Sequence, residues 1–291
     1  MKLLKNKTAI AVISVLFCAI IYALSIPLIK LINFNAPLLQ GGLLYFGAGF
    51  GIFLTTIFKK RNKTLRLTLK ELPYLISMIL LDISAITFLV IGISKTNSSN
   101  VSLLSNFELV ATSLVACLFF KEAVSKKLFG AIILICIACT ILSFEGFEGF
   151  IFNQGSIFVL LATLCWGIEN NCTRCLSIKD VREITIIKGV FAGFFGIVLS
   201  LILKETVPDV KIIILTMLIG FISYGVSVSL YIFSQRHLGA AKTGAYYSIA
   251  PYAAVILSLV ILGEKLQMQF FMALFIMIIA GILVIQDTLN A

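Results

Sequence analysis

Long apolar segments separated by short polar ones run through the whole chain. A helix needs roughly 20 apolar residues to cross a hydrocarbon core, and ten segments come close to that length. Most of the connections are short, so consecutive helices are expected to run antiparallel. The pattern predicts an all-α membrane protein with ten transmembrane helices. The predicted spans are residues 8–29, 36–58, 72–93, 98–120, 127–143, 155–174, 184–203, 211–233, 240–262 and 267–286.

The composition agrees with a chain that lies mostly in lipid. Of its 291 residues, 60% are hydrophobic and 12% are charged, and the mean hydropathy is +1.10. A soluble domain has about a quarter charged residues and under half apolar ones. The lipid bilayer is therefore an expected partner. The first apolar segment follows three lysines but lacks a small-residue cleavage site, so it is interpreted as a retained span.

Lysine and arginine predict the orientation of the spans. If the N-terminus lies in the cytoplasm, 18 of the 23 Lys and Arg residues fall on the inner side and 5 on the outer side. Cytoplasmic loops of membrane proteins carry such an excess. Both termini are therefore predicted to be cytoplasmic. This topology also explains the net charge of +10, so no nucleic-acid partner is expected.

The chain contains a weak internal duplication. A shift of 142 residues superposes the pattern of residues 100–143 on that of the stretch 236–285, with Glu122 at the position of Glu264. Each half of the chain holds five predicted spans, so the second half starts on the opposite side of the membrane and the two repeats are inverted. The predicted parts are residues 1–145 (first repeat), 146–154 (short outer linker) and 155–291 (second, inverted repeat).

An inverted repeat is typical of transporters that work by alternating access, because two similar bundles can rock about a central site. The chain has no Walker loop, and its seven cysteines and one histidine lack zinc-site spacing. Neither an enzymatic activity nor a cofactor or metal is predicted. Glu122 and Glu264 are interpreted as helix-end residues that fix their own hairpins.

Four motifs resemble the EamA-type branch of the drug/metabolite transporter superfamily. The resemblance implies a ten-helix, two-repeat transporter of small metabolites, amino acids or amphipathic compounds in the bacterial inner membrane. Tyr22 stands where a tryptophan is common in that family. The motifs are YGVSVSLYIFSQRHLGAAKTGAYYSIAP followed thirteen residues later by Glu264, SLLSNFELVATSLVACLFFKE (102–122), CWGIENNCTRCLS (165–177) and IKG (187–189).

Ionisable side chains inside the predicted spans are the first site candidates, since each costs about 2.5–3.5 kcal/mol to insert. Asp82 and Glu108 are expected at similar depth on adjacent antiparallel helices. Two carboxylates in a poorly solvated cavity favour binding of a proton at one of them, as proton coupling requires. For Asp82 the alternative is a hydrogen bond to a neighbouring helix. Glu169 and Lys188 are expected to form an ion pair, either structural or part of a gate.

Polar and aromatic residues complete the candidate site. Asn170 could donate an amide hydrogen bond to substrate or join two helices. Trp166, Tyr22 and Tyr246 could stack on a substrate or lie at the membrane interface. Pro251 is a candidate hinge, with a static kink as the alternative. Packing or an interfacial position is preferred for Tyr224 and Tyr247.

The predicted function is secondary active transport, as an exporter, of a small polar or amphipathic metabolite, with protons as the candidate coupling ion. One alternative is broad efflux of cationic amphiphiles. Another is a membrane protein that reuses the fold without transporting anything. Small residues at 239–248 permit close helix approach, either as a sliding surface or as the seam of a homodimer.

Overall fold

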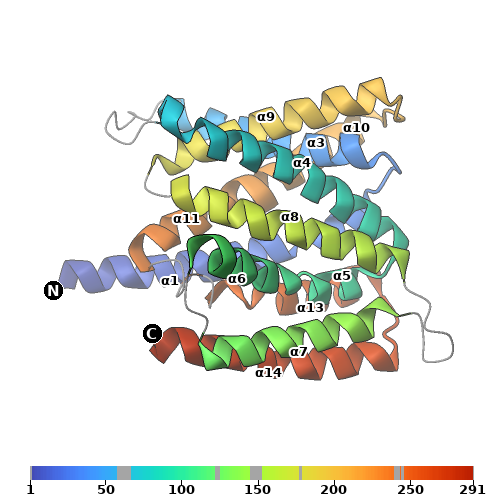
Figure 1. Ribbon diagram of the computed structural model, residues 1–291. Coiled ribbons are helices and arrows are strands. Elements are labelled where there is room, and N and C mark those ends of the chain that lie inside the picture. The colour runs from blue at the N-terminus through green and yellow to red at the C-terminus, as the bar shows by residue number, and fades with distance from the viewer. Residues whose placement is uncertain are drawn as a thin grey trace.

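The structure, a computed structural model, describes residues 2–57, 67–121, 125–144, 153–176, 179–238, 243 and 246–290. Every regular element in these ranges is helical, and the helices form one bundle (Figure 1). The elements are α1 (Lys2–Ala23), α2 (Ser25–Leu31), α3 (Pro37–Thr56), η2 (Leu69–Glu71), α4 (Leu72–Lys95), α5 (Ser98–Leu104), α6 (Phe107–Phe120), α7 (Lys126–Ser143), α8 (Gln154–Leu176), α9 (Val181–Ile202), α10 (Val210–Ile219), η3 (Gly220–Val226), α11 (Ser227–Leu238), α13 (Ala250–Leu262) and α14 (Met268–Asn290).

Eight helical segments of the described chain are long and apolar enough to cross a membrane. Two of the ten predicted spans are not among these eight. At the first of them lies α8, a 23-residue helix that carries Glu169 and Arg174. At the second lies α13, an apolar helix of only 13 residues. The all-helical class is confirmed, whereas the count of ten spans stays a prediction.

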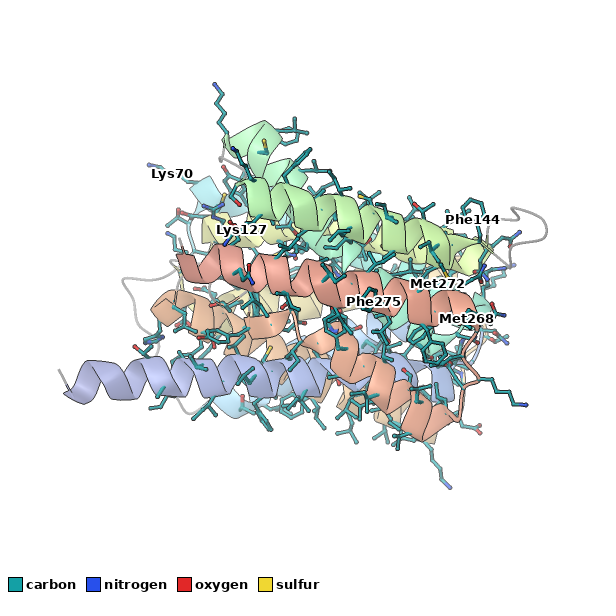
Figure 2. The ribbon with its side chains drawn as sticks, turned by 90° about the horizontal axis from the view of Figure 1, so that it is seen from below. Lys70, Lys127, Phe144, Met268, Met272 and Phe275 are labelled. Atoms are coloured by element: carbon teal, nitrogen blue, oxygen red, sulfur yellow. The ribbon has the colours of Figure 1, made fainter. Side chains whose placement is uncertain are left out.

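The outer surface of the bundle is covered by apolar side chains, which suits contact with lipid. Met268, Met272 and Phe275 project from α14 (Figure 2), and Phe275 is 66% exposed. Both chain termini lie at one end of the bundle (Figure 1), which we call the N/C end, the opposite end being the far end. Lys70 and Lys127 lie at the N/C end (Figure 2).

The main helix pairs each join an element before residue 145 to one after residue 152. They are α3 with α9, α4 with α8, α7 with α14, α1 with α11, and α5 with α13. The closest of these interfaces depends on glycine. A Cβ atom added to Gly189 of α9 would lie 2.4 Å from the backbone nitrogen of Gly49 in α3. Paired small residues let two backbones approach this closely within a membrane.

Besides the span that breaks at Leu24, between α1 and α2, two of the predicted spans contain a helix break. One break lies at residues 105–106, between α5 and α6, and the other at residues 248–249, just before α13. Pro251 follows the second break and sits in the first turn of α13. Proline is tolerated there because its missing N–H would have no partner within the helix. The expected weak point at Pro251 is therefore displaced to the turn that precedes it.

Candidate functional site

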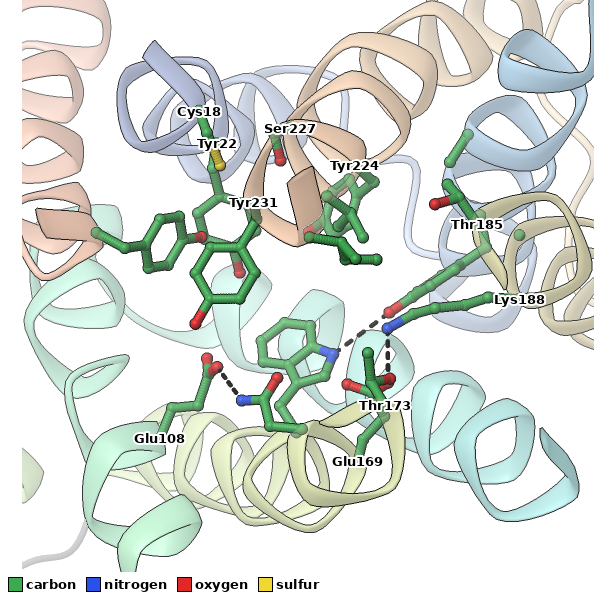
Figure 3. Close-up of a pocket in the computed structure, with 18 residues that line it drawn as sticks. Cys18, Tyr22, Glu108, Glu169, Thr173, Thr185, Lys188, Tyr224, Ser227 and Tyr231 are labelled. Atoms are coloured by element: carbon green, nitrogen blue, oxygen red, sulfur yellow. Dashed lines mark hydrogen bonds and ion pairs between the residues drawn. The ribbon is translucent and has the colours of Figure 1, made fainter. Parts of the chain in front are cut away.

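A cavity of about 100 Å³ lies inside the bundle (Figure 3). Its walls come from α1, α3, α6, α8, α9, η3 and α11, and from Tyr247, which directly precedes the turn before α13. This volume can hold several water molecules or a small solute. Among the sequence-predicted residues, the cavity brings together Tyr22, Glu108, Trp166, Glu169, Asn170 and Lys188.

The cavity extends from the middle of the bundle toward the N/C end. Thr173 contributes from the last turns of α8 and Thr185 from the first turns of α9, and these turns lie at that end. The far half of the bundle is packed with apolar side chains instead. Ile29, Ile93 and Leu104 there are fully buried in the main hydrophobic core. One end of the bundle is thus hollow and the other closed.

A charged network forms one side of the cavity, and we call its charged members the Lys188 triad. The Lys188 Nζ lies 2.9 Å from Glu169 Oε1 and 3.2 Å from Asp82 Oδ1. The predicted ion pair between Glu169 and Lys188 is therefore present. Tyr45 donates a 2.7 Å hydrogen bond to Asp82 Oδ1, and Trp166 Nε1 donates to Tyr45 Oη at 3.3 Å.

Asp82 does not form the carboxylate pair with Glu108 that the sequence suggested. No hydrogen bond joins the two side chains among the described residues; Asp82 bonds to Tyr45 and Lys188 instead. The reason is that α4 packs against α9 as well as α8, so Lys188 reaches Asp82. The second oxygen of Asp82 is buried without a hydrogen-bond partner. The Lys188 triad holds one ammonium group between two carboxylates.

Glu108 lies in the first turn of α6, directly after the break at residues 105–106. Its Oε1 accepts a 2.7 Å hydrogen bond from Asn170 Nδ2. In the described part of the chain, no lysine or arginine lies within ion-pair distance of Glu108. The positive end of the α6 dipole favours a negative charge at this position. Glu108 is thus a cavity carboxylate stabilised by an amide and a helix terminus, not by a cation.

Five tyrosine rings follow one another along the cavity wall, and we call them the tyrosine arc. Successive ring centroids are 5.7 Å apart from Tyr45 to Tyr224, 5.7 Å from Tyr224 to Tyr22, 5.8 Å from Tyr22 to Tyr247 and 5.0 Å from Tyr247 to Tyr231. Tilted and edge-to-face contacts of this kind stabilise aromatic clusters. The arc joins α3, η3, α1, the helical residue Tyr247 before the turn at residues 248–249, and α11 around one solute-sized space.

The sequence predicted only part of the tyrosine arc. Tyr224 and Tyr247, for which packing or an interfacial position was preferred, line the cavity, whereas Tyr246 is not among the lining residues. Tyr231 was missed, although it follows Tyr224 by seven residues, the spacing of one helix face. Tyr246 and Tyr247 are adjacent helical residues just before the break at residues 248–249, and the sequence pattern does not reveal which of the two faces inward.

Tyr224 reaches the cavity from a π-helical segment, η3. Such segments insert extra backbone into a helix and are frequent at functional sites. Gly220 begins this segment, and a Cβ atom there would lie 2.0 Å from the carbonyl oxygen of Leu44 in α3. Glycine therefore lets η3 pack against α3 and sets the depth of Tyr224.

A second polar cluster closes the far end, and we call it the far-end latch. Glu264, which follows α13, accepts hydrogen bonds from the Ser98 N–H (2.7 Å), the Ser99 N–H (2.9 Å) and Ser99 Oγ (2.8 Å). It also forms a 3.1 Å ion pair with Lys30, which donates to the Thr96 carbonyl at 2.7 Å. The latch joins α2, α5 and the turn after α13.

The electrostatics of Glu264 reflect these contacts. Burial alone would raise the pKa of its carboxyl, but the N–H groups of Ser99 and Ser98 and the charge of Lys30 lower this pKa below the ordinary 4.5. Glu264 was predicted to fix only its own hairpin. Its contacts show that it also connects this hairpin to the first half of the chain. Glu122, its expected equivalent, lies outside the described residues.

Within the described residues, no group of three or more His, Cys, Asp or Glu side chains is placed to hold a metal ion. The side chains that line the cavity offer ionic, aromatic and hydrogen-bonding recognition. These are the means by which a protein holds a small solute in a water-accessible pocket.

Comparison with known proteins assigns the chain to a family. The EamA-like transporter family matches it twice, at residues 9–144 and 153–286. The chain belongs to this family. It is also 25% identical over 276 residues to an "uncharacterized transporter" of Methanothermobacter thermautotrophicus, covering 88% of this chain and 80% of that protein. A solved crystal structure with 13% sequence identity has the same fold, with a TM-score of 0.66 over 97% of both chains. This EamA-family protein is thus a multi-pass membrane protein of the transporter class.

Proposed function

We propose that this EamA-family protein is a secondary active transporter that exports small polar or amphipathic metabolites, such as amino acids and related compounds, across the bacterial inner membrane by alternating access. One observation carries the proposal. A cavity lined by aromatic, charged and amide side chains lies at the centre of the bundle and extends toward the N/C end, while apolar packing and the far-end latch lie at the far end. This is the arrangement expected of one state of an alternating-access transporter.

Two inverted five-helix repeats with ten spans are part of this proposal. The helix pairing supports them, since the second helices of both halves pair (α3 with α9), as do the fifth (α7 with α14), and first helices pair with third (α1 with α11, α8 with α4). A two-fold axis that relates the two halves would pair the first helix of each half with the third helix of the other half. Lys121 and Gly263, 142 residues apart, both end their helices in the left-handed conformation, with φ of 54° and 61°.

The orientation and the energy source complete the proposal. Both termini are placed in the cytoplasm on the basis of the lysine and arginine count, so the cavity would face the cytoplasm. Protons are the proposed coupling ion, with Glu108 as the coupling residue, because this carboxylate lines the cavity and forms no ion pair in the described chain. Asp82 is the less direct candidate, as its charge is already opposed by Lys188.

Counterflow in proteoliposomes tests the proposal. Liposomes that contain the purified protein would be loaded with amino acids, nucleosides, polyamines or cationic dyes. Selective exchange of one of these classes is expected. An imposed pH gradient should change net flux in the natural protein but not in Glu108→Gln. Flux that ignores the gradient would remove the proton-coupling step. No exchange by folded protein across the whole panel would favour a function other than transport.

A further inference from the structure

The charges around the cavity leave one carboxylate without a cation. Asp82, Glu108 and Glu169 supply three carboxylates, and Lys188 is the one basic side chain among the described lining residues. Lys188 is engaged by both Asp82 and Glu169, so it offers little to the carboxylate of an incoming solute. Glu108 remains as the charge that a solute can neutralise. Complementary charge at such a site selects a positively charged partner.

The tyrosine arc provides the second part of a cation site. The faces of aromatic rings attract a cation that lies within about 6 Å of the ring centroid, and most strongly where water is excluded. The arc ends beside Glu108, because the hydroxyl end of Tyr231 points toward the Glu108 side chain (Figure 3). Tyr247 packs on Tyr231 and on Tyr22. A cation here would contact ring faces and a carboxylate together.

The opposite wall limits the chemistry further. Asn170 already donates an N–H to Glu108, and Trp166, one turn earlier on α8, also lines the cavity. The rings of the tyrosine arc form much of the remaining wall. An alkylated ammonium group suits such a wall, since it presents apolar surface to the rings and keeps its full charge.

We propose that the cavity binds a small organic cation with one alkylated ammonium group, held between the tyrosine arc and the Glu108 carboxylate. This narrows the proposed cargo from small polar or amphipathic metabolites to their cationic members, and so sets amino acid zwitterions aside. It rests on the proposed transport only for its biological use, because binding can be measured without transport. Neutral solutes lack the charge that Glu108 attracts. Zwitterions add a carboxylate that the occupied Lys188 triad does not neutralise.

Trp166 makes the test direct, since it is the single tryptophan of the chain and lies in the cavity. Its fluorescence would be followed in the purified full-length protein during titration with three probes. Each probe carries at least three methyl groups on one tetrahedral atom. The probes are tetramethylammonium, trimethylglycine as the zwitterion and tert-butanol as the neutral analogue. A saturable change is expected with tetramethylammonium, at an affinity at least about 10-fold higher than for the other two.

Variants separate the two parts of the site. Glu108→Gln should weaken tetramethylammonium binding by about 10- to 100-fold, because the cation loses the opposite charge beside it in a site shielded from water. Tyr22→Phe keeps the ring and should retain the affinity within about threefold, whereas Tyr22→Leu should lose roughly 3- to 30-fold. Glu205→Gln is the matched carboxylate control, because Glu205 caps α3 at the far end, outside the cavity. It should bind like the natural protein.

Three results would overturn the proposal: no saturable signal with tetramethylammonium, equal affinity for tert-butanol, or an unchanged affinity in folded Glu108→Gln. Failure of transport is distinguishable from these. If tetramethylammonium binds as expected but proteoliposomes exchange nothing, the cation site stands and the transport proposal fails. If zwitterions are exchanged while tetramethylammonium neither binds nor competes, transport stands and the cation site is wrong.

Discussion

Removal of the Glu264 carboxylate is predicted to release the far end of the bundle. Glu264 accepts hydrogen bonds from Ser98, Ser99 and Lys30, and its side chain is only 8% exposed. In Glu264→Ala, two N–H groups at the start of α5 and one ammonium group lose this acceptor. The helices joined by the far-end latch, which are α2, α5 and α13, then keep only their apolar contacts at this end.

The size of the effect follows from the contacts that are lost. Loss of a side-chain cap at a helix N-terminus costs about 0.5–2 kcal/mol, and a hydrogen bond to a charged group contributes about 1.5–3 kcal/mol. Lys30 is 29% exposed and keeps its bond to Thr96, so water offsets much of the lost ion pair. We expect a net loss of about 2–3 kcal/mol, which corresponds to a roughly 30- to 140-fold change in an opening equilibrium.

Hydrogen–deuterium exchange of the backbone amides measures this equilibrium helix by helix. In Glu264→Ala, exchange should accelerate together in α2, α5 and α13, because the far-end latch joins them. The matched control is Glu205→Gln, in which a carboxylate that accepts from Leu38 and Leu39 at the start of α3 is neutralised at the same end. Its effect should stay within α3. If exchange in Glu264→Ala rises only in the first turn of α5, Glu264 is a simple cap and the latch is refuted.

Three further predictions concern stability. The pKa of Glu264 is lower in the folded state than the ordinary 4.5. The carboxylate therefore contributes its full stabilisation above pH 4.5, and this stabilisation is lost as the pH falls through the folded-state pKa. Below pH 4.5 the thermal stability of the natural protein should fall more steeply than that of Glu264→Gln. Gly189→Ala should cost about 1–3 kcal/mol by overpacking against α3, whereas Gly130→Ala, with its nearest neighbour 3.7 Å away, should gain up to about 1 kcal/mol of helix propensity in the same thermal unfolding assay. Lys188→Met leaves two buried carboxylates unopposed and should cost about 3–5 kcal/mol; addition of Asp82→Asn should restore part of that loss, and a further additive loss would contradict the triad.

The apolar pattern was sufficient to predict the helical class and most helix positions, because segment length and polarity are local properties. The Glu169–Lys188 ion pair was also predictable. The two residues lie on consecutive antiparallel helices, so their depths follow from sequence position alone. The partner of Asp82 was not predictable in this way, because α4 meets α9 through the tertiary fold.

Features that depend on local helix geometry or on contacts between distant residues could not be predicted from the sequence. Tyr247 lines the cavity and its neighbour Tyr246 does not, and the apolar pattern does not distinguish these two adjacent tyrosines just before the turn at residues 248–249. The partners of Glu264 lie 165 and 166 residues away at Ser99 and Ser98. No local pattern indicates such a pairing, so a hairpin role was the natural interpretation.

The Lys188 triad is expensive as a source of stability. A buried ion cluster rarely exceeds well-packed apolar side chains in stabilisation, and Asp82 here also keeps one buried oxygen without a partner. Its placement has a clearer consequence for charge. Asp82 and Glu169 together hold the ammonium of Lys188 on the α9 side of the cavity, away from Glu108. Without its ion pairs to Asp82 and Glu169, Lys188 could neutralise Glu108 itself. The triad therefore preserves Glu108, the carboxylate without an ion pair among the described residues that line the cavity, on which both proton coupling and cation binding would depend.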